Sequence, residues 1–556
     1  MKNLVLLLVV LVSFGCISVK HPNVTVVEKP LTSIKVKKTK PKLVIGIVVD
    51  QMRYDYLTRF YSKYGNGGFK RLMNDGFNFK NNHFNYTPTY TGPGHASIYT
   101  GTTPKTHAII GNSWYDKYEN TSVYCAGDSS VLPVGTKNKA GLMSPHRMKT
   151  TTFGDENRLF TQFNGKTIGV SIKDRGAILP AGHSANAAYW FHGANEGVFI
   201  SSSYYMSNLP KWVQDFNSSN TVKSYLKEWN TLYPIETYTE SGSDKNNFEY
   251  GFKKQTNFPY NLKELARVKK PFDIIKATPY GNSLVADFAI EAIKNEDLGQ
   301  DEFTDVLTVS FSSTDYVGHN FGVNSKEVED TYIRLDKDLE RFLNFLDTNV
   351  GTNNYTLFLT ADHGAIDVPT YLKTKQIPAG YVNEKVIEDK LAAFLDQQFK
   401  VSGLIKKISN DQVFLDTELI KSNRLNKAVI EEAIVNEIIT YNTVYKAYSS
   451  KTLLTTDFTK GSAYLLQNGY NQKYSGDVVF MFDPNYISYK KTGSTHGSGF
   501  NYDTHVPLLF YGNGIKQGET FNKTEITSIA PTISALLGIS FPNGSSNVVL
   551  SEALIN

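Results

Sequence analysis

The sequence is poor in cysteine. Its 556 residues include only Cys16 and Cys125, so a framework of several disulfides is excluded. If Cys16 is removed or modified during export, no internal disulfide remains. Cys125 lies between Tyr124 and Ala126, and we interpret it as a packed thiol rather than a nucleophile. The stability of the fold must therefore come largely from core burial.

The sequence also lacks a strong excess of charge of either sign. The formal net charge is +5, with 20% charged and 40% hydrophobic residues. This balance gives little support to nucleic-acid binding. Aromatic residues are abundant at 13%, and most of them are Tyr and Phe. The length allows three or four domains or one enlarged α/β domain.

At the N-terminus the longest apolar run, Leu4 to Phe14, is too short to span a membrane. Its layout predicts an export signal over residues 1–16, and Gly15-Cys16 resembles a bacterial lipoprotein box. A plain cleaved signal is the alternative. Residues 17–41, which are rich in Lys, are expected to form a solvated basic tether. We therefore expect a periplasmic protein or a lipid-anchored one facing the periplasm, with Cys16 as its lipidated residue.

Apolar, β-branched runs that end near carboxylates indicate buried strands with polar C-terminal ends. They lie at Lys42–Asp50, at Asp305–Phe311 before Asp315, at Tyr355–Thr360 before Asp362, and at His505–Phe510. Four such strands separated by helices predict a doubly wound α/β sheet. The clearest helix spans about Ser325 to Leu346, and Asn324 with Glu327 suggests a capping box at its start.

Two stretches, near 186–282 and 371–491, do not follow the sheet pattern. We interpret them as insertions that roof the site in one catalytic domain over 42–556. The second is expected to hold helices near Asn383–Phe399 and Asn423–Thr440 and a strand at Asp477–Phe482.

Carboxylates and imidazoles follow several of these strands. Asp315 and His319 are four residues apart, Asp362 and His363 are adjacent, and Asp50 and His496 complete the set. The carboxyl ends of parallel strands meet at one edge of a sheet, so these side chains are expected to converge. Zn²⁺ accepts His nitrogen and carboxylate oxygen, and six donors are too many for one tetrahedral ion. The pattern predicts two Zn²⁺ ions. Any one of these residues alone would more often be structural.

A candidate nucleophile lies in the segment Tyr86-Thr-Pro-Thr-Tyr-Thr91-Gly-Pro-Gly-His95-Ala-Ser97, which reads as a turn into a short helix ending near Gly101. A hydroxyl at a helix start faces unpaired N–H groups and the positive end of the dipole. Coordination to Zn²⁺ would make Thr91 a nucleophile. The alternative is that Thr91 only caps the helix.

Together these motifs resemble the alkaline phosphatase superfamily, and most of all its PafA-like phosphate monoesterases with a threonine nucleophile. The resemblance runs from about Lys42 to the C-terminus and includes Ala530–Gly538, which is similar to the closing helix of that superfamily. It implies a mostly parallel sheet flanked by helices. It also implies that one zinc is held by Asp315, His319 and His496, and the other by Asp50, Asp362, His363 and Thr91.

The same resemblance implies that Asn112, Lys173 and Arg175 contact phosphate oxygens. A point cation, a guanidinium and a neutral donor suit the charge of a phosphoryl group. Without the rest of the pattern, Lys173 and Arg175 would be read as a solvated loop and Asn112 as a turn residue. His95, His183 and His505 are expected to support or pack rather than bind metal.

We therefore expect a monomeric zinc-dependent phosphatase that hydrolyses phosphate monoesters through a phosphothreonine intermediate, with no nucleic-acid partner. The alternative is a nucleotide pyrophosphatase or phosphodiesterase of the same superfamily, and Lys173 with Arg175 favours the monoesterase. A sulfatase is disfavoured because no Cys-x-Pro-x-Arg motif is present. A catalytically silent binding module is disfavoured because no expected ligand is missing. The sequence does not identify the natural substrate.

Overall fold

The computed structural model describes residues 40–267 and 270–555. The predicted export signal, Cys16 and nearly all of the predicted tether lie outside these residues. Within the described part, no helix combines the length and apolar character needed to cross a membrane.

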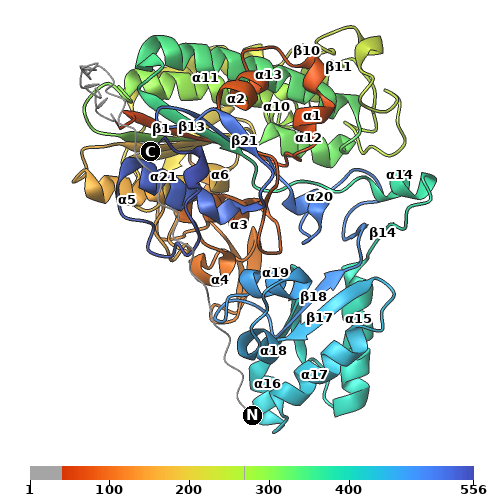
Figure 1. The fold of residues 1–556 in the computed structure, drawn as a ribbon. Helices are drawn as coiled ribbons and strands as arrows, with labels where there is room; N and C mark the ends of the chain where they lie inside the picture. Colours follow the sequence, from red (N-terminus) through yellow and green to blue (C-terminus); the bar gives the residue numbers. More distant parts are fainter. Residues whose placement is uncertain (1–39, 268–269, 556) are drawn as a thin grey trace, which may run out of the picture. The chain divides into compact units, whose positions relative to one another are not determined.

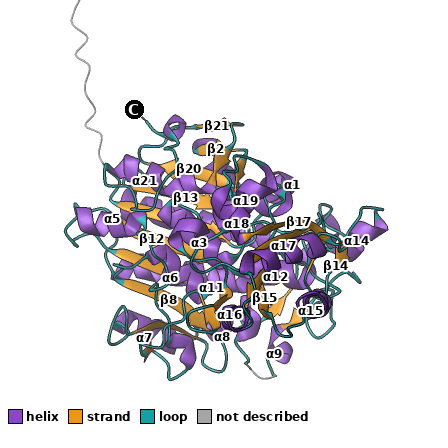
Figure 2. Cartoon of the chain, turned by 90° about the horizontal axis from the view of Figure 1, so that it is seen from below, coloured by secondary structure: helices purple, strands orange, loops and turns teal. Residues whose placement is uncertain are grey.

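A ten-stranded sheet forms the centre of the fold (Figure 1). Its middle strand, β1 (Leu43–Val49), is buried along its whole length and pairs in parallel with β12 (Asp305–Phe311) and β13 (Tyr355–Thr360). Figure 2 shows the strands following one another from β21 to β8, with helices beside them. In spatial order the sheet contains β21 (Gly518–Thr520), β2 (Phe77–Phe79), β20 (Leu508–Gly512), β13, β1, β12, β7 (Thr167–Ser171), β8 (Ala187–His192), β9 (Val198–Ser202) and β6 (Pro133–Val134).

The sheet is mixed, with a parallel centre running from β13 to β8. The sequence suggested that 505–510 forms another strand of the parallel type, but β20 pairs antiparallel with β13. An apolar run does not encode strand direction, which explains the error. The stretch expected to be an insertion near 186–282 begins with β8 and β9, which belong to the sheet.

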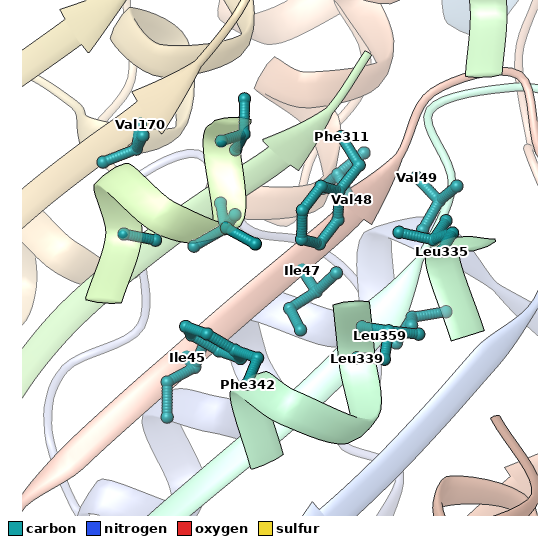
Figure 3. Packing of buried hydrophobic residues seen from close by; sticks show 14 of the residues in the cluster. Ile45, Ile47, Val48, Val49, Val170, Phe311, Leu335, Leu339, Phe342 and Leu359 are labelled. Carbon is teal, nitrogen blue, oxygen red and sulfur yellow. The ribbon is translucent and has the colours of Figure 1, made fainter. Parts of the chain in front are cut away.

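The predicted long helix is α13 (Lys326–Leu346). Its apolar face supplies Leu335, Leu339 and Phe342 to the core against Ile45 and Ile47 of β1 (Figure 3). The capping box predicted at Asn324 and Glu327 is wrong. Ser325 is the N-cap and its hydroxyl accepts from the Val328 N–H, whereas Glu327 is turned toward Tyr260.

The stretch 371–491 carries a core of its own. Its four-stranded sheet has the order β15 (Ile405–Ser409), β16 (Gln412–Leu415), β18 (Val478–Phe482), β17 (Val444–Ser449). Helices α15 (Glu384–Phe399) and α17 (Lys427–Ile438) pack on it. The expected helix at 383–399 and strand at 477–482 are confirmed, while α17 begins later than predicted because Asn426 is its N-cap. Figure 1 shows this part in cyan to light blue.

Further helices lie around the main sheet. They include α3 (Thr91–Thr100), α6 (Asp174–Ala181), α9 (Leu262–Leu265), α11 (Pro279–Asn295), α12 (Ser313–Phe321) and α21 (Ile529–Leu537). Helix α3 packs against both α6 and α21, so the helix that begins at Thr91 is held from two sides. Helix α21 is the predicted closing helix.

Candidate active site

The strand-end carboxylates converge as predicted. Asp50 follows β1, Asp315 lies in the first turn of α12 after β12, and Asp362 follows β13. These three strands are neighbours in the sheet and run in parallel, so their carboxyl ends lie at one edge. All three carboxylates are buried.

Two groups of donor atoms form at this edge. Asp315, His363 and His496 bring one ligand atom each within 4.8 Å of one another, and so do Asp50, Asp362 and His363. His363 belongs to both groups. His319 lies next to the first group, since its Nε2 is 3.1 Å from Oδ1 of Asp315. Every residue that the sequence predicted as a metal ligand thus lies at or beside these two groups.

The three imidazoles are oriented by the backbone. Nδ1 of His319 donates to the Ser494 carbonyl at 2.7 Å, and Nδ1 of His496 donates to the Thr89 carbonyl at 2.8 Å. Nδ1 of His363 donates to the Gly364 carbonyl at 2.9 Å. A proton fixed on Nδ1 leaves the Nε2 lone pair free to bind a metal.

The carboxylates keep lone pairs available for the same purpose. Within the described residues, Oδ1 of Asp50 is buried without a hydrogen bond. Oδ2 of Asp50 contacts Nζ of Lys173 at 2.7 Å, and Oδ2 of Asp362 contacts Nδ1 of His95 at 3.3 Å. Burial and the neighbouring Asp362 raise the pKa of Asp50. Burial also opposes ionisation of Asp315, but His319 and Lys173 outweigh it and lower the pKa of Asp315. Free oxygens and nitrogens in a buried acidic site fit a divalent ion that accepts both donors, as Zn²⁺ does.

Thr91 is the first residue of α3 and is 1% exposed. Its Oγ1 lies 3.5 Å from Nε2 of His363 and 3.5 Å from Nζ of Lys173. The capping alternative is wrong, since Tyr90 is the N-cap and no side chain caps this helix. Gly94 lets the helix approach the metal ligands, because a Cβ there would lie 2.3 Å from the Asp362 carbonyl oxygen.

The helix start offers fewer free N–H groups than the sequence suggested. The Gly92 N–H donates to Oδ1 of Asn112 at 2.7 Å, and the Gly94 N–H donates to the Tyr90 carbonyl. Pro93 has no N–H. Stabilisation of an anion beside Thr91 therefore falls mainly to side chains and bound metal.

Of the three predicted phosphate contacts, Lys173 lies next to Thr91 and Asn112 binds the Gly92 N–H that follows it. Asn112 presents its NH₂ group because its oxygen is held by Gly92. Lys173 is buried, and its Nζ contacts Oδ2 of Asp315 at 2.6 Å and Oδ2 of Asp50 at 2.7 Å. Arg175, in the first turn of α6, donates from Nη1 to the Tyr124 hydroxyl at 3.0 Å, while its buried Nε has no hydrogen bond in the described structure.

Gln51 is a site residue that sequence reasoning missed. It adopts a left-handed backbone with φ 64°, which is uncommon for a residue with a side chain. Its N–H donates to Oδ1 of Asp362 at 3.1 Å, and its Nε2 donates to Oδ1 of Asp315 at 2.8 Å. Gly318 makes room for it, since a Cβ there would lie 1.9 Å from Oε1 of Gln51. Its only sequence signal is its place directly after Asp50.

The remaining histidines behave as expected. His95 is fully buried, donates from Nδ1 to the Thr91 carbonyl at 2.9 Å, and contacts Oδ2 of Asp362 at 3.3 Å, so it supports the site. His183 contacts the Met148 carbonyl and His505 contacts the Lys80 carbonyl, away from the metal ligands. Cys125 is a buried free thiol, and burial raises its pKa to about 12, which fits a packed residue.

Comparison with known proteins gives a consistent result. The family described as "Type I phosphodiesterase / nucleotide pyrophosphatase" matches residues 44–506. Alkaline phosphatase PhoV of Synechococcus elongatus is 47% identical over 93% of each chain. Alkaline phosphatase PafA of Elizabethkingia meningoseptica is 44% identical over 93% of this chain and 95% of its own. A crystal structure of wild-type PafA superposes with a TM-score of 0.89 at 44% identity, covering 93% of this chain and 99% of that chain.

Proposed function

The chain belongs to the type I phosphodiesterase / nucleotide pyrophosphatase family and is a PafA-like alkaline phosphatase, and we propose that it cleaves phosphate monoesters through a phosphothreonine at Thr91 with two Zn²⁺ ions bound. The observation that carries this proposal is the position of Thr91 Oγ1. It starts α3, is buried, and lies 3.5 Å from both His363 Nε2 and Lys173 Nζ.

The residues that would hold the metal are those predicted from the sequence. We propose Asp315, His319 and His496 for one ion, and Asp50, Asp362, His363 and Thr91 for the other. Bound zinc supplies Lewis-acid stabilisation of the charge that develops on the attacking and leaving oxygens. The sharing of His363 between the two donor groups supports a pair of adjacent ions.

The covalent step is a displacement at phosphorus. The Thr91 hydroxyl loses its proton to solvent and Oγ1 forms a bond to phosphorus as the ester P–O bond breaks, and the alcohol leaves with a proton from solvent. Water then attacks the phosphothreonine, the P–O bond to Thr91 breaks, Oγ1 takes up a proton, and inorganic phosphate is released. Asn112, Lys173 and Arg175 hold the nonbridging oxygens during both displacements, and positioning with charge stabilisation provides most of the acceleration.

The monoester preference rests on Lys173 and Arg175. A monoester dianion exposes three nonbridging oxygens, whereas a diester has a second substituent and one less negative charge. Two cations that contact the phosphoryl group favour the more highly charged substrate. The test is release of nitrophenol from nitrophenyl phosphate and from methyl nitrophenyl phosphate, with and without a chelator. Faster monoester turnover that the chelator abolishes would support the proposal, and faster diester turnover would favour a phosphodiesterase.

We also propose export and lipid anchoring at Cys16, from the apolar run and Gly15-Cys16. One lipid anchor with a basic tether gives surface association. Mass analysis of the native N-terminus tests this. An intact Met1 would contradict export, and an unlipidated start would contradict the anchor.

A further inference from the structure

Two buried glutamates, Glu249 and Glu327, have carboxylate oxygens without a hydrogen-bond partner in the described structure. Glu249 is 5% exposed and Glu327 is 0% exposed. Both carboxylate oxygens of Glu249 and Oε2 of Glu327 make no hydrogen bond. The one remaining oxygen, Oε1 of Glu327, accepts from the Tyr260 hydroxyl at 2.5 Å. Buried carboxylate oxygens are normally hydrogen-bonded, so three without a partner indicate a missing ligand.

Within the described part of the chain, these two carboxylates have no ion-pair partner. Among the described residues, no Lys, Arg or His forms a salt bridge with Glu249 or Glu327. Burial, together with Glu327 and Asp244, raises the pKa of Glu249 to about 11 in spite of the nearby Asn246 amide. Burial also raises the pKa of Asp244, and neither the Phe258 N–H nor the charge of Lys326 outweighs it. Unpaired buried carboxylates are costly unless a proton or a bound cation neutralises them.

The loop that carries Glu249 is attached to the segments that hold His319. The N–H groups of Tyr250 and Gly251 donate to the Asn320 carbonyl at 2.7 and 3.2 Å, one residue after His319. On the other side of Glu249, the Phe248 carbonyl accepts from the Gly493 N–H at 2.8 Å. Gly493 precedes Ser494, whose carbonyl accepts from Nδ1 of His319. The position of Glu249 is therefore linked to the orientation of a metal-ligand imidazole.

We propose that Glu249 and Glu327 bind a calcium ion at a site separate from the two zinc ions, and that this ion holds the 248–251 loop against the segments around His319. The donors are all oxygens, with no imidazole or thiolate among them, which is the donor set of a hard cation. Calcium accepts six to eight oxygens in flexible geometry, including carbonyls and water, so the two carboxylates suffice as anchors. Magnesium demands a more regular octahedron and keeps its waters, which suits a buried pair less well.

The competing state is a protonated carboxyl pair with no metal. Equilibrium dialysis of the full-length, zinc-loaded protein against calcium, followed by elemental analysis of bound calcium and zinc, separates the two. We expect one calcium per chain and a melting temperature that rises with calcium concentration. Magnesium and sodium at equal ionic strength should not reproduce the rise. Absence of bound calcium at millimolar concentration would overturn the proposal, and so would equal effects of magnesium.

Matched variants assign the site. Glu249→Gln and Glu327→Gln keep the side-chain volume and should each abolish calcium binding and the calcium-dependent rise in melting temperature. Glu264→Gln removes the same charge from an exposed position in helix α9 and should leave both unchanged. Zinc content, measured in the same samples, should stay at the wild-type level when calcium is absent from all of them. Normal calcium binding by the Glu249 and Glu327 variants would place the ion elsewhere and contradict the assignment.

Discussion

The side-chain amide of Gln51 donates to Oδ1 of Asp315 at 2.8 Å while its backbone N–H donates to Oδ1 of Asp362 at 3.1 Å. One residue therefore orients a carboxylate from each of the two proposed metal sites. The left-handed backbone at Gln51 makes this double contact geometrically feasible, since it turns the N–H toward β13 and the side chain toward α12. A strained backbone persists where its surroundings determine it, as they do here.

Removing the amide should weaken both metal binding and turnover. Gln51→Gly keeps the left-handed backbone and loses only the side chain, and we expect about a 10- to 100-fold loss in zinc affinity or kcat/KM. Gln51→Glu should be no better, because a carboxylate would face Asp315. Zinc competition with a chelator and nitrophenyl phosphate kinetics measure the two effects. Wild-type zinc affinity in Gln51→Gly would show that the amide does not position the ligands.

Gly318 provides an independent check of the same contact. A Cβ at this position would lie 1.9 Å from Oε1 of Gln51, so Gly318→Ala should displace that side chain and lower zinc affinity. In the double variant with Gln51→Gly, the added methyl group meets no amide, and the two losses should be less than additive. Fully additive losses would mean that Gly318 acts through something other than Gln51.

The proposed metal ligands should be individually essential. Replacing His319, His496, Asp50 or Asp362 with Ala removes a donor atom, so we expect turnover to fall to background and zinc content to drop below two ions per chain. His183→Ala is a matched control, because this histidine contacts the Met148 carbonyl outside the site. Elemental analysis with nitrophenol release measures both quantities. A ligand variant with full activity would remove that residue from the assignment.

Lys173 and Arg175, the proposed phosphate contacts, should separate monoester from diester turnover. We expect Lys173→Ala with Arg175→Ala to lower monoester kcat/KM by about 10² to 10⁴, if each charged contact contributes about 1.5 to 3 kcal/mol and the two are not fully additive. Diester kcat/KM should fall much less. Comparing kcat/KM on the two substrates isolates how strongly the transition state is bound through the additional negative charge of the monoester.

Zinc content is a necessary control in this experiment, because Lys173 contacts Asp50 and Asp315 directly. Arg147→Ala with Lys149→Ala removes the same charge elsewhere and should leave the substrate ratio unchanged. Equal losses on both substrates would return support to the phosphodiesterase alternative.

Acid stability should depend on His107, which lies outside the metal site. Burial lowers the pKa of His107 to about 3, and its Nδ1 accepts from the Ile109 N–H at 3.1 Å. In the unfolded chain this histidine binds a proton near pH 6.5, whereas in the folded chain it stays neutral at that pH. Its contribution to the free energy of unfolding is therefore complete above pH 6.5 and is lost as the pH falls toward 3. The loss of unfolding free energy amounts to several kcal/mol, since each unit of pKa difference corresponds to about 1.4 kcal/mol.

His107→Asn retains an acceptor but cannot titrate. Urea unfolding at pH 4.5 and pH 7, in zinc-free samples of both proteins, measures the effect without acid release of metal. The loss of unfolding free energy between the two pH values should be smaller in the variant. An equal loss would show that other groups set the acid sensitivity.

The sequence predicts the fold class and the convergence of the strand-end carboxylates, but not every detail of the scaffold around them. Asp50, Asp315 and Asp362 could be found because each follows a buried strand, and parallel strands bring such ends together. The direction of β20 could not be found, since its apolar run fits either orientation. Nor could Gln51, because its role depends on a left-handed backbone that no local pattern marks. Nor could the capping of α13 by Ser325, since Glu327 contacts Tyr260, a residue 67 positions away, instead of closing the predicted box.

The most direct test of the central claim is to trap the covalent intermediate. Zinc-loaded enzyme is mixed with a phosphate monoester, quenched in acid and digested, and the phosphorylated peptide is sequenced by mass spectrometry. Thr91→Ser should retain appreciable activity and form the same adduct on Ser, whereas Thr91→Ala should keep bound zinc and lose the adduct with most of its turnover. The account predicts a phosphoryl group on Thr91 in the wild type, and a phosphoryl group on any other residue would contradict it.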